Sequence, residues 1–270
     1  MDMRYVACSA TDIGNGRTVN QDAASIKIPK SGEEGCYMAV VCDGVGGLSR
    51  GEYASRCMRR RLENWFLYEY PQIAKDAEAD RVIPERLRRM IEQQNRLLYE
   101  YGQEKGIRCA TTVSALLFDR GKYHIAHVGD SRIYRIGEEV EQITEDQTLT
   151  AWKIRKKLLT EEEAGREPGK NIITQSVGAD RGIEILFYQG TAKGNTSFLV
   201  CSDGFYHHME RKELLESFHR KDYRDARALG KELVRLIGLL KERGERDNIS
   251  AAVIWQRESC GRGENGTAYE

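Results

Sequence analysis

The sequence has no excess of charge of either sign, no long apolar run and no apolar signal core at its N-terminus. Its 42 basic residues equal its 42 acidic residues, which excludes a globally basic nucleic-acid-binding protein. The apolar runs are far shorter than the ~20 residues that a membrane-spanning helix needs. We therefore expect a cytosolic protein that binds neither nucleic acid nor a membrane.

Paired cysteine motifs are also missing. The seven cysteines are odd in number and none belongs to a Cys-x-x-Cys pair, which excludes a zinc ribbon and a thioredoxin motif. In a reducing compartment we expect them to be small buried apolar side chains. They are Cys8, Cys36, Cys42, Cys57, Cys109, Cys201 and Cys260.

The composition that remains is that of a globular protein. Hydrophobic residues make up 40% and charged residues 31% of the 270 residues. Because the chain contains no internal repeat and no low-complexity linker, we expect one domain over residues 1–257. Residues 258–270 are polar and glycine-rich, and we expect this tail to fray.

Short runs rich in Val, Ile, Tyr and Thr predict strands separated by brief turns. Breaks as short as Asp119-Arg120-Gly121 and Gly129-Asp130 allow hairpins but no parallel crossovers, so the sheets should be mostly antiparallel. The predicted strands are Tyr5–Thr11, Ala23–Ile28, Tyr37–Cys42, Thr111–Phe118, Tyr123–Val128, Arg132–Ile136, Glu184–Gln189, Ser197–Cys201 and Ile249–Trp255.

Apolar residues at three- and four-residue spacing predict four helices, at about Gly51–Tyr68, Pro84–Tyr101, Met209–His219 and Tyr223–Arg243. Pro84 suits a first turn, Asp222 an N-cap, and Gly244 the position after a helix end. Two helices interrupt the early strands and two precede the last one. This order predicts an α+β fold in which helix pairs cover an antiparallel sheet system.

The segment Thr144–Asp180 departs from this pattern. It is rich in charged residues, contains one or two short helical pieces, and separates two strand regions. We expect a mobile insertion on the surface that contributes to a binding site.

Five aspartates stand at the ends of predicted strands: Asp22, Asp43, Asp130, Asp203 and Asp247. A single aspartate after a strand is usually a turn former. Five of them can converge, because neighbouring strands lie only about 4.8 Å apart. Converged carboxylates repel one another unless a cation neutralises them, and an all-oxygen site suits Mg²⁺ or Mn²⁺. The glycines after Asp43 and Asp203 allow close approach of the backbone, so that a carbonyl could join the ligands.

Seven motifs in order resemble the metal-dependent protein phosphatases, the PPM or type 2C family, and the insertion is most similar to the bacterial branch. The resemblance runs from about Thr11 to Ile254. The motifs are Arg17-x-x-Asn20-Gln21-Asp22, Asp43-Gly44-x-Gly46-Gly47, Ala110-Thr111-Thr112, Gly129-Asp130-Ser131-Arg132-x-Tyr134, Ile173-Thr174-x-x-x-Gly178, Cys201-Ser202-Asp203-Gly204 and Asp247-Asn248-Ile249-Ser250.

The resemblance implies a four-layer sandwich of two mostly antiparallel sheets flanked by pairs of helices, with Thr144–Asp180 as a flap. It implies two Mn²⁺ or Mg²⁺ ions bridged by Asp43, with Asp203 and Asp247 on one ion and the Gly44 carbonyl on the other. The remaining implied roles concern water, a weaker third ion and the substrate phosphate. Asp22 and Gln21 would hold metal-bound waters, Asp130 would hold the third ion with Asp203, and Arg17 would bind the phosphate, for which a planar guanidinium is suited.

Four positions depart from the family pattern. Val45 stands where eukaryotic members often have a histidine, so that this side chain cannot act as a general acid. Gln21 replaces a more common acid, Ala110 a glycine, and Gln147 the histidine of an Asp-His pair in the flap. None of these changes removes an expected direct metal ligand.

Other candidate sites have simpler explanations. His124 and His127 should point to opposite faces of a strand, and His207-His208 should lie on the surface at the start of a helix. Arg59-Arg60-Arg61 spreads around a helix, which favours a solvated face over a nucleic-acid patch. The basic run of the insertion is a better candidate for a functional site, because it could lie beside a bound phosphopeptide. It consists of Lys153, Arg155, Lys156 and Lys157.

The function that follows is hydrolysis of phosphoserine and phosphothreonine in proteins by a hydroxide that bridges two metal ions. Neither a cysteine six positions before an arginine nor an Asp-x-Asp-x-(Thr/Val) motif occurs, so a covalent phosphoenzyme is not expected. Two alternatives stay open: a weak or silent member that binds phosphoproteins, and a partner-switch regulator with one small protein substrate. We expect a monomer whose partners are the substrates of a serine/threonine kinase.

Overall fold

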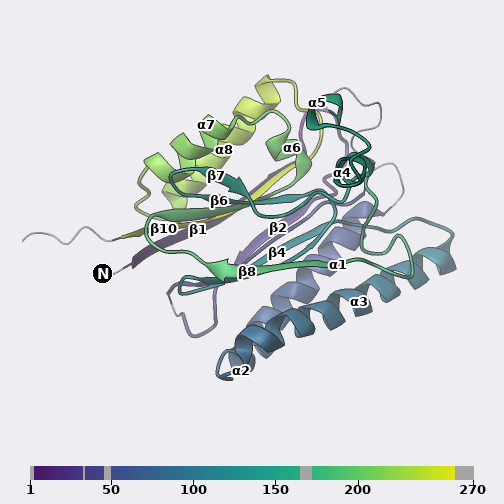
Figure 1. Ribbon diagram of the computed structural model, residues 1–270, viewed down its shortest axis with the longest axis horizontal. Coiled ribbons are helices and arrows are strands. Elements are labelled where there is room, and N and C mark those ends of the chain that lie inside the picture. Colours follow the sequence, from purple (N-terminus) through teal and green to yellow (C-terminus); the bar gives the residue numbers. More distant parts are fainter. Residues whose placement is uncertain (1–2, 33, 46–49, 165–171, 259–270) are drawn as a thin grey trace, which may run out of the picture.

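Two five-stranded sheets pack face to face between pairs of helices, as Figure 1 shows in a computed structural model of the chain. The structure describes residues 3–32, 34–45, 50–164 and 172–258. Every pair of strands in both sheets is antiparallel. The predicted α+β class and four-layer sandwich are therefore confirmed. Gly46, Gly47, Cys260 and most of the predicted tail lie outside the described residues.

The first sheet has the strand order β1-β10-β9-β6-β7. Its strands are β1 (Met3–Asp12), β10 (Ile249–Glu258), β9 (Thr196–Cys201), β6 (Arg132–Ile136) and β7 (Val140–Gln142). The sequence did not predict β7, because three residues are too few to show an alternating pattern. The second sheet has the order β2-β3-β4-β5-β8. Its strands are β2 (Ala23–Lys27), β3 (Cys36–Cys42), β4 (Val113–Asp119), β5 (Lys122–Val128) and β8 (Leu186–Thr191).

Helices cover the outer face of each sheet (Figure 1). The second sheet is covered by α1 (Gly51–Asn64), which continues through a π-helical turn into α2 (Tyr70–Ile73), and by α3 (Ala79–Lys105). The first sheet is covered by α7 (Arg211–Leu215) and α8 (Ala226–Glu242). The short helix α6 (Asp203–Tyr206) follows β9, and the insertion contains α4 (Leu149–Arg155) and α5 (Glu161–Ala164). No helix in the described ranges is long and apolar enough to cross a bilayer.

Three apolar layers hold these elements together. Between the sheets, the rings of Phe118 on β4 and Phe198 on β9 lie 5.6 Å apart, and both side chains are buried. Trp65 packs in the layer under α1 and α3, and Trp255 packs under α8. Burial of large aromatic side chains contributes about 2–3 kcal/mol each. Because these layers fix the sheets, the loops at the strand ends are held in a defined arrangement.

Three local predictions are wrong. Pro84 is not in the first turn of its helix, because α3 begins five residues earlier, at Ala79. The earlier turn is held by Ile83, which is buried in the core. His207 does not begin a helix but follows the last residue of α6. The N-cap of α8 is Asp225 rather than Asp222: Asp225 Oδ1 accepts a hydrogen bond of 2.8 Å from the backbone of Ala228.

The cap of α8 can be tested by two matched substitutions. Asp225→Ala should lower the free energy of unfolding by about 1 kcal/mol, because a backbone N–H of the first turn loses its acceptor. Asp222→Ala should change it by less than about 0.5 kcal/mol, because Asp222 makes an exposed ion pair with Arg4. Urea denaturation of both variants measures the difference, and equal losses would contradict the assignment of the cap.

Candidate active site

The five aspartates at strand ends lie together at one end of the two sheets. Ala23 on β2 is paired with Cys42 on β3, so Asp22 and Asp43 are neighbours where the two strands end. Arg132 on β6 is paired with Cys201 on β9, and continuing this antiparallel register places Asp130 opposite Asp203. Asp247 precedes β10, which lies between β1 and β9. The sheet register therefore produces the acidic cluster.

The backbone of Asp43 is fixed by two threonines of the loop before β4. Its N–H donates to Thr112 Oγ1 over 2.9 Å, and its carbonyl accepts from the Thr112 N–H over 2.8 Å. The hydroxyl of Thr111 donates to the same carbonyl over 2.9 Å. The Ala-Thr-Thr motif thus positions a carboxylate without touching its oxygens.

Two glycines are required by close approach of the backbone. A Cβ atom on Gly44 would lie 2.5 Å from the carbonyl carbon of Gly51, and one on Gly204 would lie 2.2 Å from the carbonyl oxygen of Asn248. Since both distances are far below a normal contact, any larger residue would push apart the loops that carry Asp43, Asp203 and Asp247.

Burial and mutual repulsion raise the pKa values of these carboxyls. Burial and the charges of Asp22, Asp203, Asp130 and Asp247 raise the pKa of Asp43 well above its usual range. Burial and the charge of Asp203 raise the pKa of Asp130 to about 8. The pKa of Asp22 is raised to about 6, mainly by burial, which nearby serine hydroxyls offset only in part. The cluster disfavours its own negative charge.

The same carboxyls have oxygen atoms that are buried without a hydrogen-bond partner. These atoms are both carboxyl oxygens of Asp22, Asp130 Oδ1 and Asp203 Oδ1. Unpaired buried oxygen atoms cost free energy, and a cation would satisfy them. The donor set therefore fits Mg²⁺ or Mn²⁺, which take oxygen ligands.

The carboxylates of the cluster do not converge on a single point in this structure. Within the described ranges, no group of three His, Cys, Asp or Glu side chains is arranged to hold a metal ion. One carboxylate of the cluster is instead engaged by a guanidinium. Arg17 donates to both oxygens of Asp247, from Nε over 2.7 Å and from Nη2 over 2.5 Å. This ion pair also raises the pKa of Arg17.

Around the cluster, amide side chains hold the loops. Asn248 Oδ1 accepts from the N–H of Gln21 over 2.8 Å, and the Gln21 carbonyl accepts from Gly44 N–H over 3.1 Å. Gln147 is buried, and its side chain accepts from Gly129 N–H and donates to the Glu184 carbonyl. Gln147 thus ties the loop that carries Asp130 to the insertion.

Two residues next to the cluster were not predicted as part of it. Glu245 is 6% exposed, and its Oε1 accepts from the backbone N–H of Asp247 over 2.8 Å. His207 is exposed, as predicted, and its Nε2 lies 4.0 Å from Asp203 Oδ2. The sequence signal for both is only their spacing, two residues before Asp247 and four after Asp203.

The thiols beside the cluster are inert. Cys42 and Cys201 are fully buried at the ends of β3 and β9, and burial strongly raises the pKa of both. As predicted, Cys36 and Cys109 are also buried, whereas Cys8 and Cys57 are only partly buried. A neutral, buried thiol is not a nucleophile.

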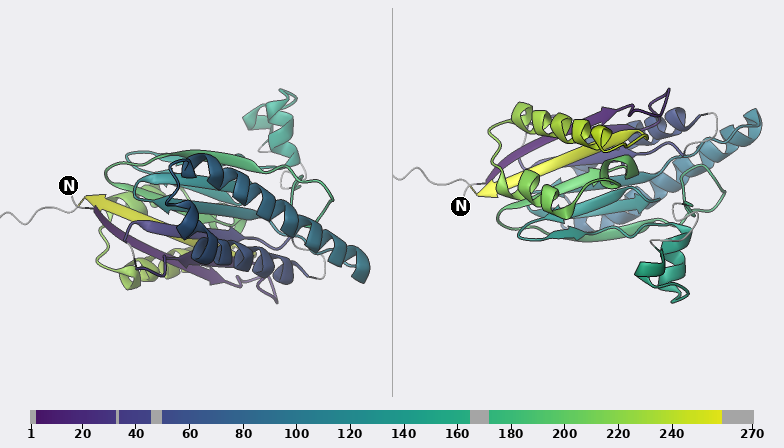
Figure 2. Two further views of the ribbon diagram at one scale, coloured as in Figure 1. Left: turned by 90° about the horizontal axis from the view of Figure 1, so that it is seen from below. Right: turned by 90° about the horizontal axis from the view of Figure 1, so that it is seen from above.

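The insertion borders the cluster. Figure 2 shows α4 and α5 (teal) projecting from one side of the sandwich. A cleft of about 380 Å³ lies between them and the core, and Asp130 and His207 line it together with Ala151 and Ile154 of α4. The predicted basic residues do not line this cleft: Arg155, Lys156 and Lys157 are exposed beyond it, Lys153 is partly buried, and Arg155 pairs with Glu145 over 3.3 Å.

The predicted separation of the two strand histidines is confirmed. The side chain of His124 lies 3.2 Å from Asp80 of α3, on the helix-covered face of β5. His127 lies on the other face, where Ser114 Oγ is 2.9 Å away from its Nδ1. Burial lowers the pKa of His127 to about 4, so it is a neutral core residue.

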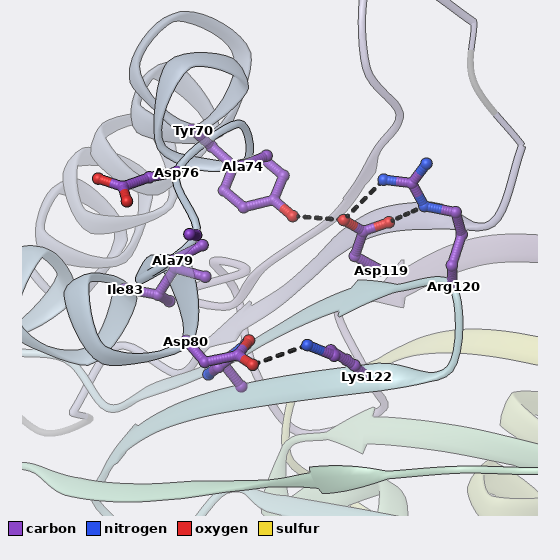
Figure 3. Close-up of a pocket in the computed structure, with 11 residues that line it drawn as sticks. Tyr70, Ala74, Asp76, Ala79, Asp80, Ile83, Asp119, Arg120 and Lys122 are labelled. Atoms are coloured by element: carbon purple, nitrogen blue, oxygen red, sulfur yellow. Dashed lines mark hydrogen bonds and ion pairs between the residues drawn. The ribbon is translucent and has the colours of Figure 1, made fainter.

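A second pocket, of about 280 Å³, lies at the opposite end of β4 (Figure 3). Lys122 pairs with Asp80 over 2.7 Å, and Tyr70 donates to Asp119, which also pairs with Arg120. The carboxylates of Asp80 and Asp119 thus each have a cationic partner, unlike the buried carboxylates of the first cluster.

Comparison with known proteins gives a consistent result. Residues 13–237 match the model of a family described as protein phosphatase 2C. The protein phosphatase PhpP of Streptococcus pneumoniae is 30% identical over 252 residues, which cover 92% of this chain and 96% of that protein. The serine/threonine phosphatase stp of Listeria monocytogenes is 27% identical over 90% of this chain and 93% of its own length.

Solved structures agree with these matches. The structure of the S. agalactiae serine/threonine phosphatase has a TM-score of 0.80 at 29% identity, covering 94% of this chain and 100% of that one. The catalytic domain of the phosphatase PstP in complex with two manganese ions shares the fold, with a TM-score of 0.73 at 22% identity over 95% of this chain and 100% of that one.

The raised pKa of Asp130 makes a pH-dependent prediction for the metal-free protein. Between pH 5 and 8 the folded state retains a proton on Asp130 that the unfolded state has lost, so wild-type stability falls as pH rises. Asp130→Asn removes this contribution. In EDTA, the stability of the variant relative to wild type should therefore increase by roughly 2–4 kcal/mol from pH 5 to pH 8. Urea denaturation at four pH values measures this change, and a difference independent of pH would contradict it.

Proposed function

The chain belongs to the protein phosphatase 2C family and is a serine/threonine protein phosphatase, and we propose that its acidic cluster is the metal centre at which phosphoserine and phosphothreonine are hydrolysed. The observation that carries the proposal is the set of buried carboxylate oxygens without hydrogen-bond partners at the strand ends, whose negative charge a cation would stabilise. The retained aspartates favour an active enzyme over a silent phosphoprotein-binding module.

The direct ligands would be carboxylates and one carbonyl. Asp43 would contact two ions of Mn²⁺ or Mg²⁺, with Asp203 and Asp247 on one and the Gly44 carbonyl on the other. Asp22 and Gln21 would orient waters, and Asp130 with Asp203 would hold a weaker third ion. The hydrogen bonds to the backbone of Asp43 support this assignment, because they leave its carboxylate oxygens available.

Bound divalent ions would lower the pKa of a water molecule and neutralise the charge of the phosphate. The chain itself supplies the rest of the chemistry. Arg17 would bind two phosphate oxygens through its planar guanidinium. The thiols of Cys42 and Cys201 are buried and cannot act as nucleophiles. Their burial supports direct attack of water on the phosphorus atom. Because Val45 cannot donate a proton, protonation of the leaving oxygen would come from water.

The substrates are phosphorylated proteins, and serine/threonine kinases would supply them, because only such a reaction forms the ester that this site hydrolyses. The basic residues of the flap would contact acidic side chains around the phosphorylated residue. The exposed positions of Arg155, Lys156 and Lys157 beyond the cleft support a role in binding rather than in chemistry. The basic residues of the flap are Lys153, Arg155, Lys156 and Lys157.

Replacement of a cluster carboxylate should abolish turnover. Asp43→Asn and Asp203→Asn should each reduce Mn²⁺-dependent hydrolysis of a phosphoserine peptide more than about 100-fold, because a ligand is lost. Both variants should melt no lower than wild type in EDTA at pH 8, because repulsion is relieved. Asp80→Asn, in the pocket of Figure 3, is the matched control and should retain wild-type turnover. Wild-type turnover in either cluster variant would refute the assignment.

The Arg17–Asp247 pair makes a separate prediction. Since the guanidinium occupies a proposed metal ligand, Arg17→Ala should bind Mn²⁺ at least as tightly as wild type, roughly threefold to tenfold tighter. The same variant should be inhibited at least tenfold less by inorganic phosphate, which loses a bidentate partner. Calorimetry and inhibition kinetics measure the two effects. Loss of Mn²⁺ binding with unchanged phosphate inhibition would show that Arg17 has a different role.

A further inference from the structure

One arginine beside the cluster has no partner for its charge. Arg246 immediately precedes Asp247 and is exposed. The guanidinium of Arg17 is engaged by Asp247. That of Arg243 is engaged by Glu213 over 2.6 Å. The guanidinium of Arg246 has neither an ion pair nor a hydrogen bond within the described part of the chain, so it is available to a ligand.

The backbone of Arg246 ties two loops together. Its carbonyl accepts from the Gly16 N–H over 2.9 Å, and its own N–H donates over 2.7 Å to the carboxylate of the preceding residue. A Cβ atom on Gly14 would lie only 1.8 Å from the Asp247 carbonyl oxygen, so the two loops are in direct contact there as well. The residue before Asp247 is therefore held against the residue before Arg17.

The side chain of Arg246 lies across Gly16. A Cβ atom on Gly16 would be 2.7 Å from Arg246 Cβ and 3.2 Å from Arg246 Nε, so a larger residue at position 16 would displace the arginine. Because Nε belongs to the guanidinium, the charged group begins beside the loop that carries Arg17 instead of extending away from it. Arg246 and Arg17 thus present their guanidinium groups from adjacent loop positions.

The order of strands places Arg246 and the insertion on opposite sides of the cluster. In the sheet β1-β10-β9-β6-β7, the loop of Arg17 follows β1 and the loop of Arg246 precedes β10. Asp203 follows β9 and Asp130 precedes β6, at the same end of the sheet. The insertion begins after β7, the edge strand on the other side. A peptide that crosses the cluster in this direction would have one flank near the flap and the other near Arg246.

We propose that Arg246 is a specificity-determining residue that binds the carboxylate of an acidic residue on the flank of the phosphorylated residue that lies away from the flap. The proposal rests on the proposed function, in which Arg17 binds the phosphate. The guanidinium of Arg17 is shared between Asp247 and that phosphate, whereas Arg246 keeps its planar donor set for a further carboxylate. The favoured substrates are phosphoproteins with aspartate or glutamate on that flank.

The test compares three phosphoserine peptides, with acidic residues only before the phosphoserine, only after it, or on neither side. Turnover by the full chain is measured with Mn²⁺. Arg246→Ala should lower kcat/KM for one of the acidic peptides, relative to the neutral peptide, about three- to fivefold. The loss should appear in KM rather than in kcat, because the contact is made equally in the ground state and the transition state. An unchanged ratio, or equal losses for both acidic peptides, would overturn the proposal.

Two controls separate a specific contact from general damage. Arg243→Ala removes the same charge from the same segment, but this guanidinium is engaged by Glu213, so the variant should keep the wild-type peptide ratios. The preference that depends on Arg246 should also weaken in about 1 M NaCl, where charges are screened beyond about 3 Å. Equal losses in Arg243→Ala and Arg246→Ala, or a preference that salt does not weaken, would contradict the assignment.

The outcomes separate this inference from the proposed function. If wild type hydrolyses the peptides and Asp43→Asn does not, whereas Arg246→Ala keeps the wild-type ratios, the metal centre stands and the role of Arg246 is wrong. If wild type hydrolyses none of the peptides with Mn²⁺, both the proposed function and the role of Arg246 are wrong.

Discussion

Mutual repulsion of buried carboxylates is the constraint on which the rest of this structure depends. Burial raises the pKa values of Asp22, Asp43, Asp130 and Asp203, and these raised pKa values express the cost of holding negative charge there. A fold gains nothing from such a cluster by itself, because apolar residues would pack there at lower cost. The cluster is explained when a cation is part of the working protein. In the structure, one positive charge beside the cluster is supplied by Arg17, which donates to both oxygens of Asp247.

The sandwich confines the repelling carboxylates to the ends of its strands, outside the apolar layers. Three apolar layers hold ten strands in register, and the register alone brings Asp22 beside Asp43 and Asp130 opposite Asp203. Backbone hydrogen bonds from Thr111 and Thr112 then hold Asp43 in place. Glycine at positions 44 and 204 lets the loops approach closely enough for the carboxylates to meet. The apolar layers stabilise the fold, and the loops at the strand ends carry the residues of the proposed metal centre.

Much of this could be predicted from the sequence, because strands and acidic residues leave local signals. Apolar runs followed by Asp-Gly marked Asp43 and Asp203, and the short breaks between strands indicated antiparallel sheets. Contacts between distant segments leave no such signal. Arg17 and Asp247 are 230 positions apart, and only the folded chain shows that they pair. The cap of α8 was misplaced because Asp222 and Asp225 are both good cap residues, and the choice depends on where the helix packs. Glu245 was missed because its hydrogen bond to the backbone of Asp247 follows from the turn after α8, which leaves no pattern in the sequence.

The central claim is that the acidic cluster is a metal centre bridged by Asp43. The most direct measurement is anomalous X-ray diffraction from crystals of the full chain grown with Mn²⁺. The account predicts two strong anomalous peaks about 3.5–4 Å apart, with the Asp43 carboxylate between them and Asp203 and Asp247 at one of the two. Anomalous peaks found only elsewhere, with none beside Asp43, would contradict it.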